Sequence, residues 1–145
     1  MKYNHRSSRF LLIFCAFLLS SSVFAELLIE EGYVRKPIPG RSMSAAFMTI
    51  NNTGVADVVL KTAAIEGTKN VEIHTHTHKE GVMRMRQIHE LVVKAGNSIV
   101  LAPGGLHLMM FGIEKLPETP QLTLCDELNN CSTFPLSVRN LVPQP

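Results

Sequence analysis

The chain has 145 residues, a formal net charge of +2 at pH 7 and a hydrophobic fraction of 46%, which is enough to bury one core in one domain. Three basic residues, Lys2, Arg6 and Arg9, lie near the N-terminus, leaving 11 of the 14 basic residues against 12 acidic ones in the rest of the chain. These charges are not gathered into a basic face, so the sequence excludes the kind of surface that nucleic acid requires.

The first 25 residues have the pattern of a cleaved signal peptide. The three basic residues precede or border an apolar run over residues 10–19, and Val23-Phe24-Ala25 places small residues where signal peptidase reads them. The run is shorter than the roughly 20 residues of a membrane-spanning helix, and Cys15 lies within it without a lipobox. We therefore expect export to the periplasm, removal of residues 1–25 and one domain over residues 26–145 without a membrane span. An uncleaved N-terminal anchor is the alternative.

From residue 27 onward, the sequence favours short β-strands, because segments rich in β-branched residues lie between clusters of turn residues. The expected strands cover residues 28–34, 45–51, 58–65, 70–76, 82–88, 91–94, 98–101, 106–113, 121–124 and 134–138. The segment 95–97 is expected to form a hairpin-like connection between two of them. Strands at this spacing predict an all-β fold, a single-domain antiparallel β-sandwich with Greek-key connections.

Two cysteines, Cys125 and Cys131, follow the N-terminal segment. In an oxidising compartment, a pair this close in sequence predicts a disulfide bond. Closing so short a loop stabilises the fold by roughly 2 kcal/mol in the chain-entropy model. A reduced pair that binds metal or does redox chemistry is the alternative.

Histidines and methionines form the group most typical of a functional site. Beyond the N-terminal segment the chain has five histidines and six methionines, and most lie between residues 74 and 110. They are His74, His76, His78, Met83, Met85, His89, His107, Met109 and Met110. Thioether sulfur binds hard cations poorly, whereas Cu(I) accepts both sulfur and imidazole nitrogen. Zinc more usually recruits cysteine or carboxylate beside histidine. The mixture therefore predicts a copper site.

The spacing of these donors suits β-strands. Residues two apart in a strand point to the same face, about 6.6 Å from each other. Three pairs have this spacing, namely His74 with His76, Met83 with Met85, and His107 with Met109. If the strands flanking the break at Gly81 are neighbours, His74 and Met85 could converge across them.

Some members of the group have structural explanations instead. Met48 and Met110 are expected to pack in the core, as methionines in strands usually do. His89 is expected to be a surface residue outside the site. The run His-Thr-His-Thr-His at residues 74–78 could be an exposed polar strand face, although a structural role does not require three imidazoles on one face.

These residues resemble the signature of the periplasmic copper chaperone family called PCu(A)C. Ten residues separate His74 from Met85, 21 separate Met85 from His107, and one separates His107 from Met109. The segments around residues 34–40, 46–52, 71–74, 81–86 and 103–109 also look like the blocks of this family, in the same order. The resemblance covers about residues 28–125.

The resemblance implies a cupredoxin-like β-sandwich that holds one Cu(I) near its surface through His74, Met85, His107 and Met109. It also implies partners that accept copper, either periplasmic or membrane-anchored, notably the copper centres of cytochrome c oxidase. The chain departs from the family where methionine often follows the first histidine, because His76 and His78 stand there. His76 is therefore an additional candidate ligand, and imidazole donors would make binding of Cu(II) possible or build a second, weaker site.

The donor set favours a copper-binding protein over an enzyme. A hydrolase needs an open position for water and a general base nearby, and no spacing among Glu72, Glu80 and Glu90 marks a catalytic pair. A blue-copper site would need a cysteine thiolate ligand, and neither mature cysteine is near the cluster in sequence. Sequestration of copper, instead of delivery, is the second functional hypothesis. An exposed donor patch could also share a metal between two chains as a homodimer.

Overall fold

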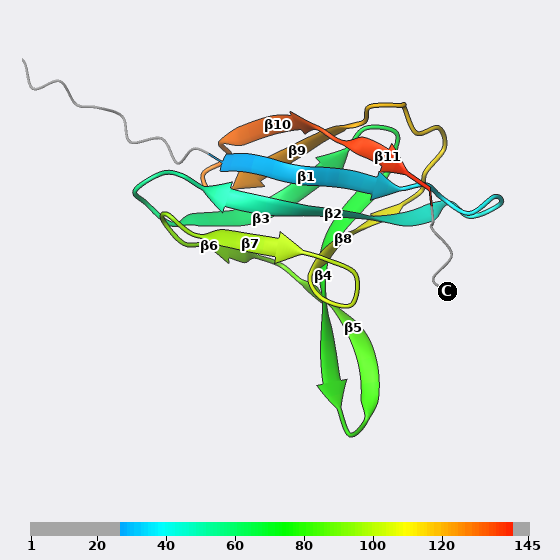
Figure 1. Cartoon of the computed structure of the whole chain (residues 1–145), viewed down its shortest axis with the longest axis horizontal. Helices are drawn as coiled ribbons and strands as arrows, with labels where there is room; N and C mark the ends of the chain where they lie inside the picture. The colour runs from blue at the N-terminus through cyan, green and yellow to red at the C-terminus, as the bar shows by residue number, and fades with distance from the viewer. Residues whose placement is uncertain (1–26, 141–145) are drawn as a thin grey trace, which may run out of the picture.

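The computed structural model describes residues 27–140, and these residues form eleven β-strands in two facing sheets (Figure 1). The strands are β1 (Leu27–Arg35), β2 (Met43–Asn52), β3 (Val58–Ile65), β4 (Asn70–Lys79), β5 (Val82–Ile88), β6 (Leu91–Val93), β7 (Ser98–Leu101), β8 (His107–Phe111), β9 (Gln121–Asp126), β10 (Cys131–Pro135) and β11 (Ser137–Arg139). The expected all-β sandwich is confirmed. The expected signal peptide, residues 1–25, lies outside the described residues. Within them, no helix has the length and apolar character needed to cross a membrane.

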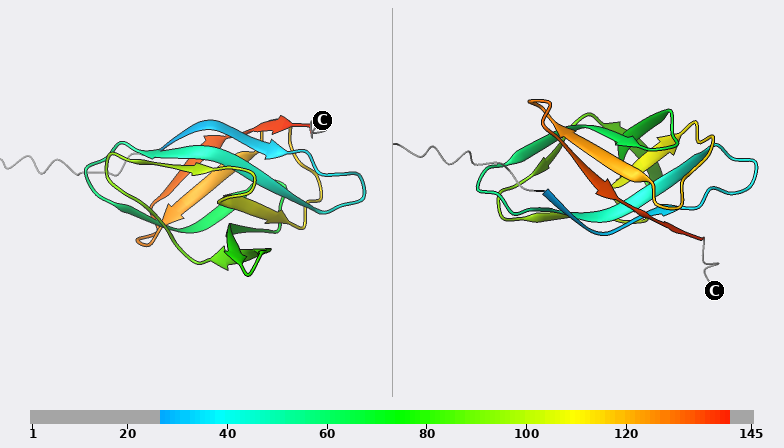
Figure 2. Two further views of the ribbon diagram at one scale, coloured as in Figure 1. Left: turned by 60° about the horizontal axis from the view of Figure 1, so that its bottom comes forward. Right: turned by 90° about the horizontal axis from the view of Figure 1, so that it is seen from above.

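The larger sheet has the strand order β11-β1-β2-β8-β4-β5, and β7 pairs with the part of the β2 edge that β8 does not use. The smaller sheet has the order β10-β9-β3-β6. Figure 2 shows β9 and β10, in orange, crossing the layer of β1 and β2 and not continuing its sheet. The chain changes sheets repeatedly, as expected for Greek-key connections. One pair, β1 with β11, is parallel, which the sequence pattern did not indicate.

The core lies between the two sheets, because alternate residues of each strand point inward. Its largest fully buried apolar side chains are Ile50, Leu60, Leu101, Leu108, Met110, Leu122, Leu124 and Leu136. Met48 is 3% exposed and belongs to the same cluster. The expectation that Met48 and Met110 are core residues is confirmed.

Replacing Met48 by alanine is expected to lower the free energy of unfolding by about 2–5 kcal/mol, because the substitution removes buried methylene groups and leaves a cavity. Denaturant unfolding followed by circular dichroism measures the change. Met48→Leu keeps the volume and serves as the control, with an expected loss below about 1.5 kcal/mol. An unchanged unfolding midpoint in Met48→Ala would contradict the core role.

The expected hairpin over residues 91–101 is wrong. The first of its strands, β6, pairs with β3 in the smaller sheet, and the second, β7, pairs with β2 in the larger sheet. The intervening residues therefore cross from one sheet to the other. Asn52 stabilises this crossing, since its buried side-chain amide donates to the Val93 carbonyl oxygen over 2.9 Å and its backbone N–H donates to the Asn97 carbonyl oxygen over 3.0 Å.

The expected strand at residues 134–138 is two strands, because the chain changes sheets at Leu136. β10 pairs with β9 in the smaller sheet, and β11 runs parallel to β1 in the larger one. Pro135 ends β10, since proline has no N–H to donate to a ladder. The Leu136 N–H instead donates to the Pro120 carbonyl oxygen over 2.9 Å, and the Leu136 side chain is buried.

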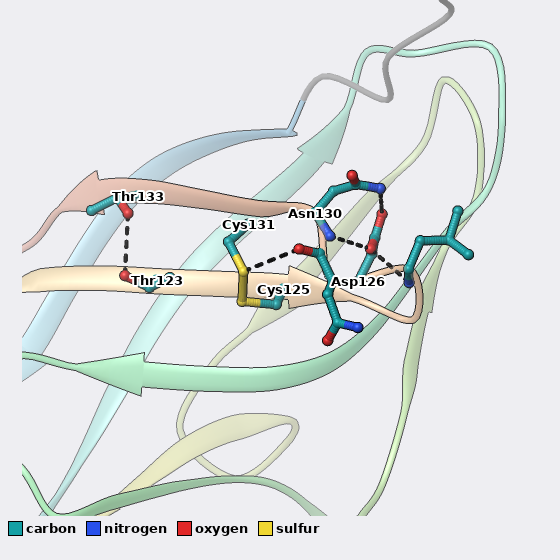
Figure 3. The surroundings of a disulfide bond; sticks show 8 residues. Thr123, Cys125, Asp126, Asn130, Cys131 and Thr133 are labelled. Carbon is teal, nitrogen blue, oxygen red and sulfur yellow. Dashed lines mark hydrogen bonds between the residues drawn. A yellow bond between two sulfur atoms is a disulfide. The ribbon is translucent and has the colours of Figure 1, made fainter.

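Cys125 and Cys131 form the expected disulfide bond, with a sulfur–sulfur distance of 2.06 Å (Figure 3). They lie directly opposite each other in the β9–β10 pair. The turn between them is stabilised by Asp126, whose Oδ1 accepts hydrogen bonds from the backbone N–H groups of Leu128 and Asn130, both over 2.8 Å. The disulfide belongs to the smaller sheet, whereas the histidine and methionine strands belong to the larger one. Its sulfur atoms are therefore not part of the donor group.

The β4–β5 hairpin extends beyond the sandwich (Figure 1). β4 pairs with β8 over residues 70–74, and beyond His74 its only strand partner among the described residues is β5. The hairpin closes in a two-residue turn, with Lys79 paired to Val82 and with positive φ angles at Glu80 (53°) and Gly81 (76°). These angles are typical of a type I′ turn, which fixes the register of the two strands.

Candidate metal centre

Three neighbouring strands of the larger sheet, β8, β4 and β5, carry the expected ligands. His107 lies directly opposite His74, and Met85 lies directly opposite His76. Met109 follows His107 by two residues on β8. Directly opposite residues of an antiparallel pair, and residues two apart in one strand, point to the same face. The register therefore gathers all five side chains on one face. The residues of β8 that alternate with His107 and Met109, namely Leu108 and Met110, are buried in the core.

The cross-strand partner of Met85 differs from the one that the sequence suggested. Met85 was expected to converge with His74, but it is paired with His76, and His74 is paired with Gln87 on that side. The two-residue turn at the end of the hairpin sets this register. His76 therefore lies nearer to the expected methionine ligand than His74 does along the β4–β5 pair.

The imidazole rings of His74, His76 and His107 lie close together. The ring centroid of His107 is 5.7 Å from that of His74 and 5.3 Å from that of His76. Two imidazoles that share one ion have centroids roughly 5–6 Å apart, because each ligating nitrogen is about 2.0–2.1 Å from the metal. The observed separations are therefore in the range of a shared metal ion.

His107 is held in one orientation. Its side chain is buried, with 4% of the residue exposed, and its Nδ1 donates to the Gly105 carbonyl oxygen over 3.0 Å. A carbonyl oxygen can only accept, so Nδ1 carries the proton and Nε2 keeps a free lone pair. Burial lowers the pKa of His107, the hydrogen bond to Gly105 opposes this effect in part, and the nearby His76, His74 and Arg35 add to the lowering. The ring is therefore neutral at neutral pH, which is the form that binds metal.

His74 is also oriented by a neighbour, Glu72. The His74 Nε2 lies 2.8 Å from the Glu72 carboxylate, and this leaves Nδ1 as the free nitrogen. A carboxylate behind a histidine is common at metal sites, where it fixes the ring and raises its basicity as a ligand. Glu72 was not among the residues expected at the site. Its spacing of two residues before His74 is the signal that could have found it.

Two buried nitrogens at this place have no hydrogen-bond partner. They are His74 Nδ1 and His76 Nδ1, and no other buried side-chain nitrogen or oxygen is unpaired among the side chains that the structure describes. A buried polar group without a partner costs about 1–3 kcal/mol, and such groups usually mark strain, function or an absent ligand. A metal ion would satisfy both nitrogens.

Replacing Glu72 by alanine is expected to weaken metal binding by about 10-fold. This is the lower end of the loss of metal affinity seen when a hydrogen-bond partner of a ligating histidine is removed. Glu72→Gln should lose less, because its amide oxygen can still accept from His74 Nε2. Competition titration measures the affinity, and the ¹⁵N shifts of His74 report which nitrogen carries the proton. Glu90→Gln, which removes an exposed carboxylate paired with Lys61, is the control. A His74 tautomer unchanged in Glu72→Ala would contradict this positioning role.

Four of the expected donor side chains face one pocket of about 430 Å³, namely His76, Met85, His107 and Met109. The thioether of Met43, which was not among the residues expected at the site, lines the same pocket. His74 does not form part of this lining. Met85 is 51% exposed, so the pocket is open to solvent on the hairpin side. The rest of the lining includes three cations, Arg35, Lys36 and Arg41, and no carboxylate among the described residues. These cations come from the β1–β2 region and were not among the residues expected at the site.

No three His, Cys, Asp or Glu side chains among the described residues are arranged to hold a metal ion by themselves. A site at this place therefore needs the thioether donors as well as the imidazoles. His89 is exposed and does not line the pocket, as expected for a residue outside the site. His78 and Met83 are also exposed and lie further along the hairpin.

Comparisons with known proteins agree with this architecture. The model of the family described as "Putative lipoprotein LpqE-like" matches residues 27–125. A curated relative, "Putative lipoprotein Lxx21020" of Leifsonia xyli, is 29% identical over 101 residues, which cover 68% of this chain. The chain spans only 61% of that relative's length.

Solved structures share the fold. A copper-bound PCuAC domain from PmoF2 has a TM-score of 0.66 at 19% identity, over 81% of this chain and 97% of that one. The solution structure of CuI-DR1885 from Deinococcus radiodurans has a TM-score of 0.64 at 22% identity, over 83% of each chain. At these identities the likeness establishes the fold, and the function depends on the site described above.

Proposed function

The chain belongs to the LpqE-like family, and from this premise we propose that it is an exported copper carrier. It binds one Cu(I) through His74, Met85, His107 and Met109, with His76 as an additional donor. It then delivers the ion to a copper-accepting protein. The lipoprotein names of the family and of the curated relative support export. The copper-bound state of structures with the same fold supports copper binding.

The observation that carries this proposal is the convergence of soft donors and unpaired nitrogens at one pocket. Three thioethers, Met43, Met85 and Met109, and two imidazoles face the same space. Two buried ring nitrogens lack partners, one on His76 in the lining and one on His74, whose ring centroid lies 5.7 Å from that of His107. Cu(I) accepts both donor types, whereas hard cations bind thioether poorly. The donor chemistry therefore fits copper better than zinc, magnesium or calcium.

The charge of the lining favours a monovalent ion. Arg35, Lys36 and Arg41 border the pocket without a facing carboxylate. Coulomb repulsion is proportional to the charge of the bound ion, so a divalent cation meets twice the repulsion of Cu(I). Imidazole donors nevertheless accept Cu(II) as well. We therefore infer a preference for Cu(I) with Cu(II) binding as a possible second state.

Delivery is a better account than catalysis, because the lining offers no carboxylate to act as a general base for water. The open side of the pocket, at Met85, gives a partner's donors access to the ion. The proteins that accept the ion are periplasmic or membrane-anchored, and the copper centres of cytochrome c oxidase are the acceptors we propose. Sequestration would use the same site and differ only in whether the ion is released.

The mature protein is expected to bind about one Cu(I) per chain tightly and to stay nearly colourless, because Cu(I) has a filled d shell. Anaerobic titration against a chromogenic competitor measures the stoichiometry and the affinity. A strong blue band on adding Cu(II) would indicate a thiolate ligand and contradict the His/Met site. Mixing the loaded protein with an apo acceptor separates delivery from storage, and sedimentation with and without copper tests for a metal-bridged dimer.

A further inference from the structure

Two donors of the histidine and methionine group lie outside the pocket, near the tip of the β4–β5 hairpin. His78 lies directly opposite Met83, and neither residue lines the pocket. Both are exposed, Met83 to 55%. We call a pair of directly opposite residues a rung. The His78–Met83 rung contributes nothing to the core, so packing does not account for this thioether and imidazole standing together.

The register of the hairpin makes this rung a continuation of the pocket. The tight turn at Glu80 and Gly81 fixes the pairing, and a slip of one residue would send histidines and methionines to opposite faces. In the observed register, the His78–Met83 rung and the His76–Met85 rung share a face. One residue separates them along each strand, Thr77 on β4 and Arg84 on β5, which corresponds to about 6.6 Å.

We propose that the His78–Met83 rung is a second, weaker Cu(I) site through which the ion enters and leaves the pocket. This inference rests on the proposed function. The rung offers the same two donor types as the pocket, and Cu(I) accepts low coordination numbers. It binds less tightly than the pocket because it has only two donors in contact with water, whereas the pocket adds oriented and unpaired imidazole nitrogens.

Transfer between the two sites is an exchange of ligands. A bond from copper to Met85 or His76 breaks as a bond to Met83 or His78 forms, and the ion remains Cu(I) throughout. Methionine has an unbranched, flexible side chain, so its sulfur can move between neighbouring rungs. The hairpin projects from the sandwich (Figure 1). A partner protein that approaches the hairpin therefore contacts the His78–Met83 rung before the buried His107.

The test compares the parent protein with the double variant His78→Ser, Met83→Leu. In the parent, a second equivalent of Cu(I) is expected to shift the Met83 methyl and His78 ring signals in NMR spectra. In the double variant this second uptake is lost, the affinity for the first equivalent is unchanged, and release from the singly loaded protein to a chromogenic chelator slows several-fold. His89→Ser removes an exposed imidazole just beyond β5, and it is expected to behave like the parent.

A double variant that still takes up the second equivalent and releases copper at the parental rate overturns the inference. A double variant whose first-equivalent affinity falls as far as that of a pocket-ligand variant also overturns it, because His78 and Met83 would then be ligands of the first site. A parent protein that binds no Cu(I) at all contradicts the proposed function itself, which is a distinguishable result.

Discussion

Replacing His107 by alanine is expected to weaken Cu(I) binding by more than roughly 100-fold. Loss of a residue that only hydrogen-bonds to a ligating histidine weakens metal binding by roughly 10- to 100-fold, and this variant removes the ligand itself. His107 is the donor at the centre of the group, since its ring lies near both His74 and His76. Its Nε2 is left free by the hydrogen bond from Nδ1 to Gly105. The variant removes a donor that is already oriented and neutral. Competition titration with a chromogenic Cu(I) chelator measures the loss.

Burial of His107 complicates this variant. The sequence-based view placed the copper near the surface, but His107 is only 4% exposed, and its ring lies 6.3 Å from that of Phe47. Alanine therefore also leaves a cavity and is expected to lower stability. Met109→Leu separates the two effects, because it removes only the sulfur donor from a side chain of similar volume. It should weaken copper binding strongly with a nearly unchanged melting temperature.

Met110→Leu is the matched control for Met109→Leu. Met110 is the next residue on β8, points into the core and is fully buried, so its sulfur cannot reach the pocket. It should leave copper affinity unchanged, as should Met48→Ala despite its loss of stability. Equal copper affinities in Met109→Leu and Met110→Leu would remove Met109 from the ligand set.

Strand positions could be predicted from the sequence because alternation reports which residues of a segment are buried. The same alternation does not report which sheet a strand joins. Residues 91–101 therefore read as a hairpin, although β6 and β7 lie in different sheets. The same limit made β10 and β11 read as one strand, because the break at Leu136 is itself a buried apolar residue. Sheet membership depends on long-range pairing, which local periodicity does not contain.

The relative positions of donors on the same strand could be predicted from the sequence. The pairing of donors on neighbouring strands could be predicted less well. The spacing of His107 and Met109 on β8 sufficed to place both on one face. The partner of Met85 depended on the length of the turn, which turned out to be two residues and selected His76. The cations Arg35 and Arg41 come from the distant β1–β2 region, and only the folded chain brings them to the pocket.

His76→Met is expected to weaken Cu(II) binding much more than Cu(I) binding. The His76 ring lies 5.3 Å from that of His107, and its buried Nδ1 has no hydrogen-bond partner, so it is placed to act as a nitrogen donor. Methionine at this position would face Met85 across the β4–β5 pair and present a second thioether. Thioether retains affinity for Cu(I), whereas Cu(II) is better served by imidazole.

Paired titrations with Cu(I) and Cu(II), on the parent and on His76→Met, measure this shift in selectivity. His89→Met is the control, because it makes the same chemical change at an exposed residue outside the pocket, and both affinities should stay at the parental values. Equal losses for the two ions in His76→Met would mean that His76 is an ordinary ligand to both. No change for either ion would mean that His76 is not a ligand. Of the two histidines with an unpaired Nδ1, only His74 would then remain as a ligand on β4. A selective loss of Cu(II) would instead show that the imidazole at position 76 gives this chain a tolerance for the oxidised ion that a methionine there would remove.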